Sequence, residues 1–251
     1  MTVTTAPGTT CYLYGIAAAD LELPAGLSGL RDQPVAKIPY GDVAAIASPF
    51  HAEHGVAARE DVLKHGQVLD AIAAVGPVIP VRFGSALEDH AAVEAELLEP
   101  GHDRYRAMLG ELRGHAQFTV RARYDERQIL TEVVAENPAI AQLRASTRGA
   151  AGSSSYGDRV RLGELVARVL EAKSAADGEA ILSRLEGHAT AVSVRAQPGL
   201  DQLIDVALLV ENSRRQEFEQ AVESLATAFA GRARLRLVGP TAPYDFVVAV
   251  E

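Results

Sequence analysis

The chain has 251 residues, of which 48% are hydrophobic and one is cysteine, and its formal net charge is −9. This length suits one large domain or two small ones, and a single cysteine excludes an internal disulfide framework. The acidic balance argues against nucleic acid as a partner, because a polyanion would be repelled unless basic residues were concentrated in one place. The N-terminus has no basic segment followed by an apolar one, and no apolar run reaches about 18 residues, so we expect a cytoplasmic protein without membrane insertion.

The first half begins with strand patterns. After a polar leader over residues 1–10, which we expect to be disordered, the apolar run at 11–17 predicts a strand. Residues 35–39 and 43–48 flank a Tyr-Gly-Asp turn and predict a hairpin.

The pattern changes to a helical period over residues 56–75. Its apolar residues recur on one stripe, with charged residues beside it, which predicts an amphipathic helix. The residues of this stripe are Val62, Leu69, Ile72 and Val75.

The rest of the first half supplies two more strands and a helix. GPVIPVRFGSAL at 76–87 predicts a central strand buried on both faces, and a helical pattern follows at 89–115. FTVRARY at 118–124 alternates apolar and polar residues, which predicts a strand with one exposed face. The order of these elements predicts that residues 11–125 form a ferredoxin-like α+β domain.

The second half, residues 126–251, again mixes helices and strands. A helical pattern at 126–144 breaks at an Asn-Pro pair, and residues 145–158, rich in Gly, Ser and Ala, predict a flexible loop. A further helical stripe weakens at Asp177-Gly178 and leads into a ββαββ pattern. We therefore expect a helical hairpin and a modified ferredoxin-like domain, so that the fold class is α+β, with two domains that are each a helix-covered antiparallel sheet.

The ββαββ pattern has its own boundaries. Ser213-x-x-Gln216 predicts a capping box at the start of its helix. Its four strands are predicted at 190–196, 203–211, 233–239 and 244–250.

One sequence pattern occurs in both halves. Gly-Pro-x-x-Pro-x-x-Phe begins at Gly76 and again at Gly239. Either the chain contains two related halves, or two glycine-proline strand entries have coincided.

Ionisable residues form no recognisable active site. Cys11 has no nearby histidine in the sequence, and no serine has the G-x-S-x-G setting, so nucleophilic catalysis lacks a candidate. His51 and His54 could share a helical face, as a zinc site needs, but no third ligand follows at a metal-binding spacing. His65 is expected to pack or cap rather than to bind a ligand. We therefore expect no enzyme activity, no cofactor and no metal.

Two predicted strands carry arginine at alternate positions. On an acidic protein, such rows could dock an acidic partner surface, since guanidinium groups pair well with carboxylates. The alternative is a solvated sheet face with internal ion pairs. The candidate partner-binding residues are Arg121, Arg123, Arg232, Arg234 and Arg236.

Several of these segments together resemble a known family. HGQVLDAI at 65–72, PVIPVRFGSAL and FTVRARY in the first half, and VALLVENSRRQEF and RLRLVGPTAPYDFVV in the second, are similar to the gas vesicle protein F and L family. The resemblance runs from Tyr12 to Val248, and departs from the family where Thr241-Ala242 replace the usual Trp-Pro. It implies two ferredoxin-like α+β domains and no catalytic residues.

The resemblance also implies a function. The protein would be a cytoplasmic accessory or minor structural protein of gas vesicle assembly, associating with the small shell protein and with other accessory proteins. The residues leave open the alternative of a small-molecule sensor or enzyme on tandem ferredoxin-like domains, since that fold hosts many functions.

Overall fold

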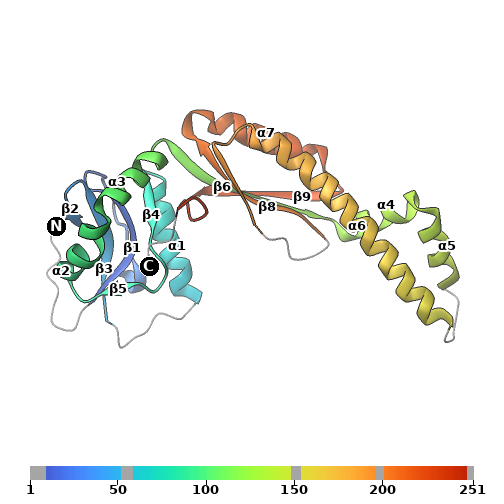
Figure 1. Cartoon of the computed structure of the whole chain (residues 1–251), viewed down its shortest axis with the longest axis horizontal. Coiled ribbons are helices and arrows are strands. Elements are labelled where there is room, and N and C mark those ends of the chain that lie inside the picture. The colour runs from blue at the N-terminus through green and yellow to red at the C-terminus, as the bar shows by residue number, and fades with distance from the viewer. Residues whose placement is uncertain (1–9, 52–58, 148–153, 196–200, 248–251) are drawn as a thin grey trace. The chain divides into compact units, whose positions relative to one another are not determined.

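The chain folds into helices and two separate β-sheets. The computed structural model describes residues 10–51, 59–147, 154–195 and 201–247 (Figure 1). Its strands fall into one sheet of β1 to β5 and another of β6 to β9. This arrangement confirms the predicted α+β fold class.

The first sheet centres on β1, Thr10–Ala18. It pairs antiparallel with β3, Val43–Phe50, on one side and with β4, Val78–Pro80, on the other. β2, Ala36–Tyr40, lies beyond β3 as the predicted hairpin, and the short β5, Ala86–Leu87, also pairs with β1. The strand order is β2-β3-β1-β4.

Helix α1, Arg59–Ala73, covers part of this core with a different stripe from the predicted one. Val62 and Val75, which we expected to be buried, are half exposed. The buried stripe is rotated because it runs through a histidine, which a purely hydrophobic pattern leaves out. The buried residues of α1 are His65, Val68, Leu69 and Ile72.

His65 is a packing residue that joins α1 to β1. Its Nδ1 lies 2.9 Å from the hydroxyl of Tyr12, and its ring stands edge-on to the rings of Tyr12 and Phe83. Burial lowers the pKa of His65 to about 4, so the imidazole is neutral at physiological pH.

The helical stretch predicted at 89–115 is present as three consecutive segments. They are α2, His90–Ala92, the π-helical turn η3, Val93–Leu98, and α3, Glu99–Leu112. The Asp89 side chain accepts a hydrogen bond from the Ala92 N–H and caps the first of them.

The second sheet contains β6, His115–Tyr124, β7, Ala191–Val194, β8, Gln202–Glu211, and β9, Ala233–Thr241, in the order β7-β8-β6-β9. We expected the strand at 118–124 to close the first sheet, and this was wrong, because β6 lies between β8 and β9. Alternation along a strand identifies its buried face but not the strands that pair with it.

Helices are interspersed with the strands of the second sheet along the chain (Figure 1). Between β6 and β7 are α4, Glu126–Glu136, α5, Pro138–Thr147, and α6, Ser154–Glu186, and between β8 and β9 is α7, Arg215–Ala228. The predicted break at the Asn-Pro pair separates α4 from α5.

Helix α6 continues unbroken through Asp177-Gly178, where we expected a weak point. A Cβ at Gly178 would come within 2.8 Å of the Leu203 carbonyl oxygen, so the glycine permits close packing of the helix on β8.

Three other local predictions need correction. The predicted loop at 145–158 is helical at 145–147 and 154–158, and 148–153 lie outside the described residues. Arg214 precedes α7 without a side-chain cap, because the Ser213 hydroxyl donates to Glu211 instead, so the capping box is wrong. The last predicted strand is absent over residues 244–247, which form a turn followed by a bend, and 248–250 are outside the described part.

The two sheets share one strand order. Numbered along the chain, each has its first strand between the third and the fourth, with the second beyond the third. The repeated Gly-Pro-x-x-Pro-x-x-Phe pattern does not follow this symmetry. Its first copy enters β4, whereas its second copy begins near the end of β9 and leaves the sheet. The two copies therefore occupy different places in the topology.

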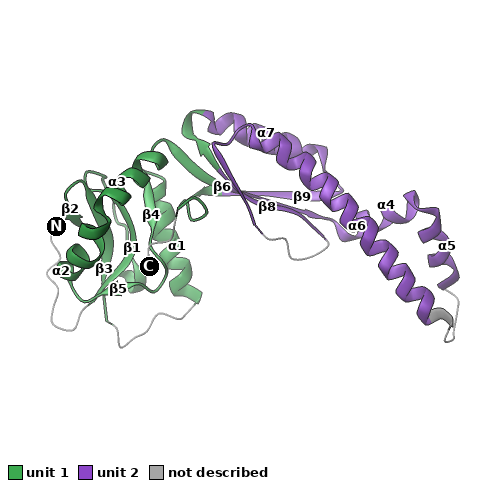
Figure 2. Ribbon diagram, viewed as in Figure 1, with its two compact units in different colours: residues 1–118, 209–213, 239–251 green, residues 119–208, 214–238 purple. Residues whose placement is uncertain are grey.

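The compact units of the chain follow a different division from the predicted domains 11–125 and 126–251. One unit comprises residues 1–118, 209–213 and 239–251, and the other comprises 119–208 and 214–238 (Figure 2). The C-terminal segment is thus grouped with the N-terminal unit.

Specific polar contacts hold this C-terminal segment in the first unit. The Ala242 N–H donates to the Asp70 carboxylate of α1 at 2.9 Å. The Gln117 amide donates to the Asp245 carboxylate at 2.8 Å and accepts from the Asp245 N–H at 3.1 Å. Ala242 is fully buried, so the segment completes the core around α1.

Candidate interaction surface

Exposed arginines alternate with buried apolar residues along β6. Arg121 and Arg123 are exposed, while Val120, Ala122 and Tyr124 are buried. The Tyr124 hydroxyl donates to Asp177 of α6, so the buried row faces the helices. The two arginines therefore point to the opposite face of the sheet.

The register of β6 and β9 brings further arginines to that face. The Asp125 N–H donates to the Arg232 carbonyl at 2.9 Å. Phe118 is seven residues before Asp125, and Gly239 is seven residues after Arg232. A Cβ on Gly239 would lie 3.1 Å from the Phe118 Cα, so these two residues are also neighbours and the strands run antiparallel.

Counting inward from the Asp125–Arg232 pair sets Arg234 opposite Arg123, and Arg236 opposite Arg121. Residues directly opposite each other in antiparallel strands share a face. The four arginines therefore lie together.

A fifth arginine reaches the same face from the end of β7. The Asp205 carboxylate of β8 accepts from Arg121 at 2.9 Å and from Arg195 at 3.3 Å. Arg234 lies 3.8 Å from Asp125. Among the described residues, Asp125 and Asp205 are the carboxylates that these distances pair with the five arginines, so positive charge is in excess on this face of an acidic protein. We call this surface the arginine face: Arg121, Arg123, Arg195, Arg234 and Arg236.

Arg232 lies outside the arginine face, although the sequence placed it in the same row. It precedes β9, and its guanidinium is 2.8 Å from Glu132 of α4 and 2.7 Å from Asp177 of α6. It also lies 5.6 Å from the centre of the Tyr124 ring. Lys173 of α6 completes the cluster at 2.6 Å from Glu132. Arg232 therefore joins two helices to the sheet.

The ionisation of this cluster reflects its ion pairs. Burial acts to raise the pKa of Glu132, but hydrogen bonds from Lys173 and Arg232 outweigh it and hold that pKa below its ordinary value. The two glutamates beside Lys173 raise the pKa of its ammonium. Burial, followed by the bond to Asp177, raises the pKa of Tyr124. At neutral pH these shifts keep Glu132 negatively charged, Lys173 positively charged and Tyr124 neutral, as their hydrogen bonds require.

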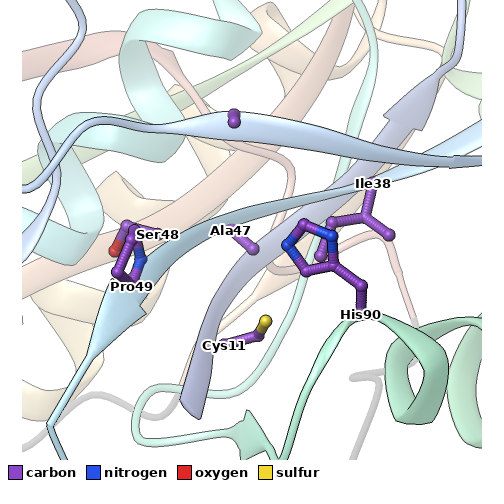
Figure 3. A pocket seen from close by; sticks show the side chains of 7 residues that line it. Cys11, Ile38, Ala47, Ser48, Pro49 and His90 are labelled. Carbon is purple, nitrogen blue, oxygen red and sulfur yellow. The ribbon is translucent and has the colours of Figure 1, made fainter. Parts of the chain in front are cut away.

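One small pocket brings together the cysteine and a histidine. Cys11 and His90 line it with Ile38, Ala47 and Pro49 (Figure 3). Cys11 has no histidine near it in the sequence, but the fold places His90, at the start of α2, in the same pocket.

The pocket nevertheless does not favour nucleophilic chemistry. Its volume is about 10 Å³, room for about one water molecule. Burial, and then the Asp89 charge, raise the pKa of Cys11, which disfavours the reactive thiolate.

The described residues contain no candidate metal centre. In the part of the chain that the structure describes, no three His, Cys, Asp or Glu side chains are grouped to hold a metal ion. His51 is described, whereas its expected partner His54 lies outside the described residues. Among the described helices, none is both long and apolar enough to cross a membrane.

Sequence reasoning found four of the five residues of the arginine face from strand alternation. It missed Arg195 and its partner Asp205. Arg195 directly follows the short strand β7, which carries no arginine, so alternation gave no signal there. A lone Asp between apolar residues in β8 was the available sign of a charged face.

Comparisons with known proteins extend over nearly the whole chain. The family model described as gas vesicle synthesis protein GvpL/GvpF matches residues 10–248. Gas vesicle protein F of a Streptomyces species is 34% identical over 239 residues, covering 94% of this chain and 98% of that protein. Gas vesicle protein L of a Streptomyces species is 28% identical, over 96% of this chain and 93% of that protein. The crystal structure of GvpF from an Anabaena species superposes with a TM-score of 0.80 at 25% identity, covering 97% of this chain and 100% of that one.

Proposed function

The chain belongs to the gas vesicle synthesis protein GvpL/GvpF family and acts in gas vesicle formation, and we propose that it does so by binding the small vesicle shell protein and other accessory proteins. In this role it is a non-catalytic assembly or minor structural protein. It works in the cytoplasm and at the growing vesicle.

The arginine face is the observation that supports this proposal. Guanidinium groups pair with carboxylates in a fixed geometry, so a flat row of them suits an acidic protein surface. The whole chain has a formal net charge of −9, so the local excess of arginine on this face favours one orientation of an acidic partner.

Exposed apolar residues at the edge of the same sheet offer a second kind of contact. β7 is the edge strand beside β8, and its Val192 and Val194 are exposed. A shell subunit that exposes apolar surface before assembly would be held in solution by such contacts.

A binding assay with purified shell protein tests the proposal. Shell subunit diluted from denaturant should stay in the supernatant when the full chain is present, and the two should co-elute on a sizing column. A matched acidic protein of similar size serves as the control for crowding. The proposal fails if the shell subunit sediments equally in both samples and a strain lacking the gene forms normal vesicles.

A further inference from the structure

Helices α4, α5 and α6 enclose an open groove of about 480 Å³ within the second unit. Its floor consists of apolar side chains from all three helices, and its rim carries Arg127 of α4 and Arg144 of α5. The apolar floor residues are Leu130, Val134, Ile140, Leu162 and Val166.

The sequence of α4 explains why this groove stays open. Ile129 and Val133 form one stripe, and both are buried. Leu130 and Val134, one residue further along, form a second stripe that is only partly buried. A helix with two apolar stripes has more apolar surface than its own unit covers, and the second stripe is therefore available to another molecule.

The charges around the groove have one sign. Arg127 and Arg144 are exposed, and they are the charged residues among the described ones that line it. Neither guanidinium has an ion-pair partner within the described residues, in contrast to Arg121 and Arg232. An occupant with carboxylates at these two places would neutralise the rim.

The shape of the groove favours a helix as the occupant. All of its lining residues lie in helices, whose backbone groups are hydrogen-bonded within the helix, so it presents no strand edge for backbone pairing. Arg127 to Val134 spans about 10 Å of helix, two turns, which matches apolar anchors spaced at i, i+3 or i+4, and i+7.

We propose that this groove binds an amphipathic helix of another polypeptide, one whose apolar stripe is flanked by acidic residues. The apolar stripe covers Leu130, Val134 and Leu162, and the flanking carboxylates pair with Arg127 and Arg144. The groove is a surface separate from the arginine face, so the two can bind at the same time or independently.

A designed peptide pair tests the proposal on the full chain. The acidic peptide is a fluorescent two-heptad helix with leucines on one stripe and glutamates beside it, and the basic peptide has lysine in place of each flanking glutamate. Fluorescence anisotropy should show that the acidic peptide binds about tenfold more tightly than the basic one at low salt.

Variants then locate the site. The double substitution Arg127→Glu with Arg144→Glu should weaken the acidic peptide by about tenfold or more and strengthen the basic peptide. Thr131→Trp should block the groove to both peptides. The matched control is Arg161→Glu with Arg168→Glu, exposed residues of α6 outside the groove, which should leave both affinities within about twofold.

Each outcome decides the proposal. Equal affinity for the two peptides, no binding of either, or binding insensitive to Thr131→Trp overturns it. A concentration-dependent dimer that the Arg127→Glu, Arg144→Glu variant abolishes would assign the groove to a second copy of the chain, and would also overturn it. Retention of the shell subunit is measured in parallel. If the shell subunit binds and the acidic peptide does not, the groove proposal fails while the proposed function stands.

Discussion

Replacing Arg232 with methionine separates the structural arginine of the second unit from those proposed to bind a partner. Methionine keeps most of the aliphatic volume and removes the hydrogen bonds to Glu132 and Asp177. Glu132 retains Lys173 as a partner, whereas Asp177 loses its cation and keeps only the Tyr124 hydroxyl among the contacts described above.

The expected loss follows from these two contacts. A hydrogen bond to a charged group contributes about 1.5–3 kcal/mol, and the arginine side chain is 30% exposed, which favours the lower end for each. We therefore expect Arg232→Met to lower the free energy of unfolding by about 2–3 kcal/mol in total. For a chain of this size, that corresponds to a fall in Tm of roughly 5–10 °C.

The dependence on pH gives a second readout of the same cluster. The folded-state pKa of Glu132 lies below its ordinary value of 4.5, so its contribution is present above pH 4.5 and is lost as the pH falls through the folded-state pKa. Arg232→Met should make this acid-side loss smaller.

Thermal unfolding followed by circular dichroism, with shell-subunit binding measured on the folded protein at low temperature, checks the prediction. Arg236→Met is the matched control, because Arg236 is exposed on the arginine face, and its stability should stay within about 0.5 kcal/mol of the original. The reasoning is refuted if Arg232→Met unfolds at the original temperature, or if it abolishes binding while leaving stability unchanged.

Three further substitutions test the first unit. Gly15→Ala should cost about 1–3 kcal/mol in urea unfolding, because its Cβ would lie 2.8 Å from the Ile79 carbonyl oxygen, and an unchanged midpoint would contradict that packing. Burial lowers the pKa of His65 from 6.5 to about 4, so folding loses stability as the pH falls below 6.5, by about 2 kcal/mol between pH 7 and 5. His65→Gln should flatten this profile, and an equally steep profile would assign the pH dependence to other groups. Asp70→Ala should speed amide hydrogen exchange at Ala242 by roughly tenfold or more, since it removes the carboxylate that this N–H binds, and unchanged exchange would show that the bond does not hold the C-terminal segment.

Local patterns in the sequence predicted most helices and strands, because each element buries a face with its own period. The partners of those elements depend on contacts between distant residues. The strand at 118–124 was correctly predicted as a strand, yet it pairs with β8 and β9, which occur at least 78 residues later in the sequence. The last segment reads as a strand, but the partly buried carboxylate of Asp70 and the amide of Gln117 provide other partners for its backbone.

The candidate surface could be predicted from the sequence wherever arginine and apolar residues alternate regularly along a strand. The alternation of polar and apolar residues correctly located Arg121, Arg123, Arg234 and Arg236 on one face of the sheet. It misplaced Arg232, because Gly231 has a positive φ of 78° and the alternation begins only after that turn. Ion pairs between residues far apart in sequence, such as Arg232 with Glu132, have no signature in a single sequence.

Binding of the shell subunit to an arginine-face variant tests the central claim most directly. The variant replaces Arg121, Arg123, Arg234 and Arg236 with serine, and its dissociation constant for purified shell subunit is compared with that of the original chain over a series of salt concentrations. The account predicts binding about tenfold or more weaker at low salt, with a smaller dependence on salt. An unchanged dissociation constant and an unchanged salt dependence in a correctly folded variant would contradict it.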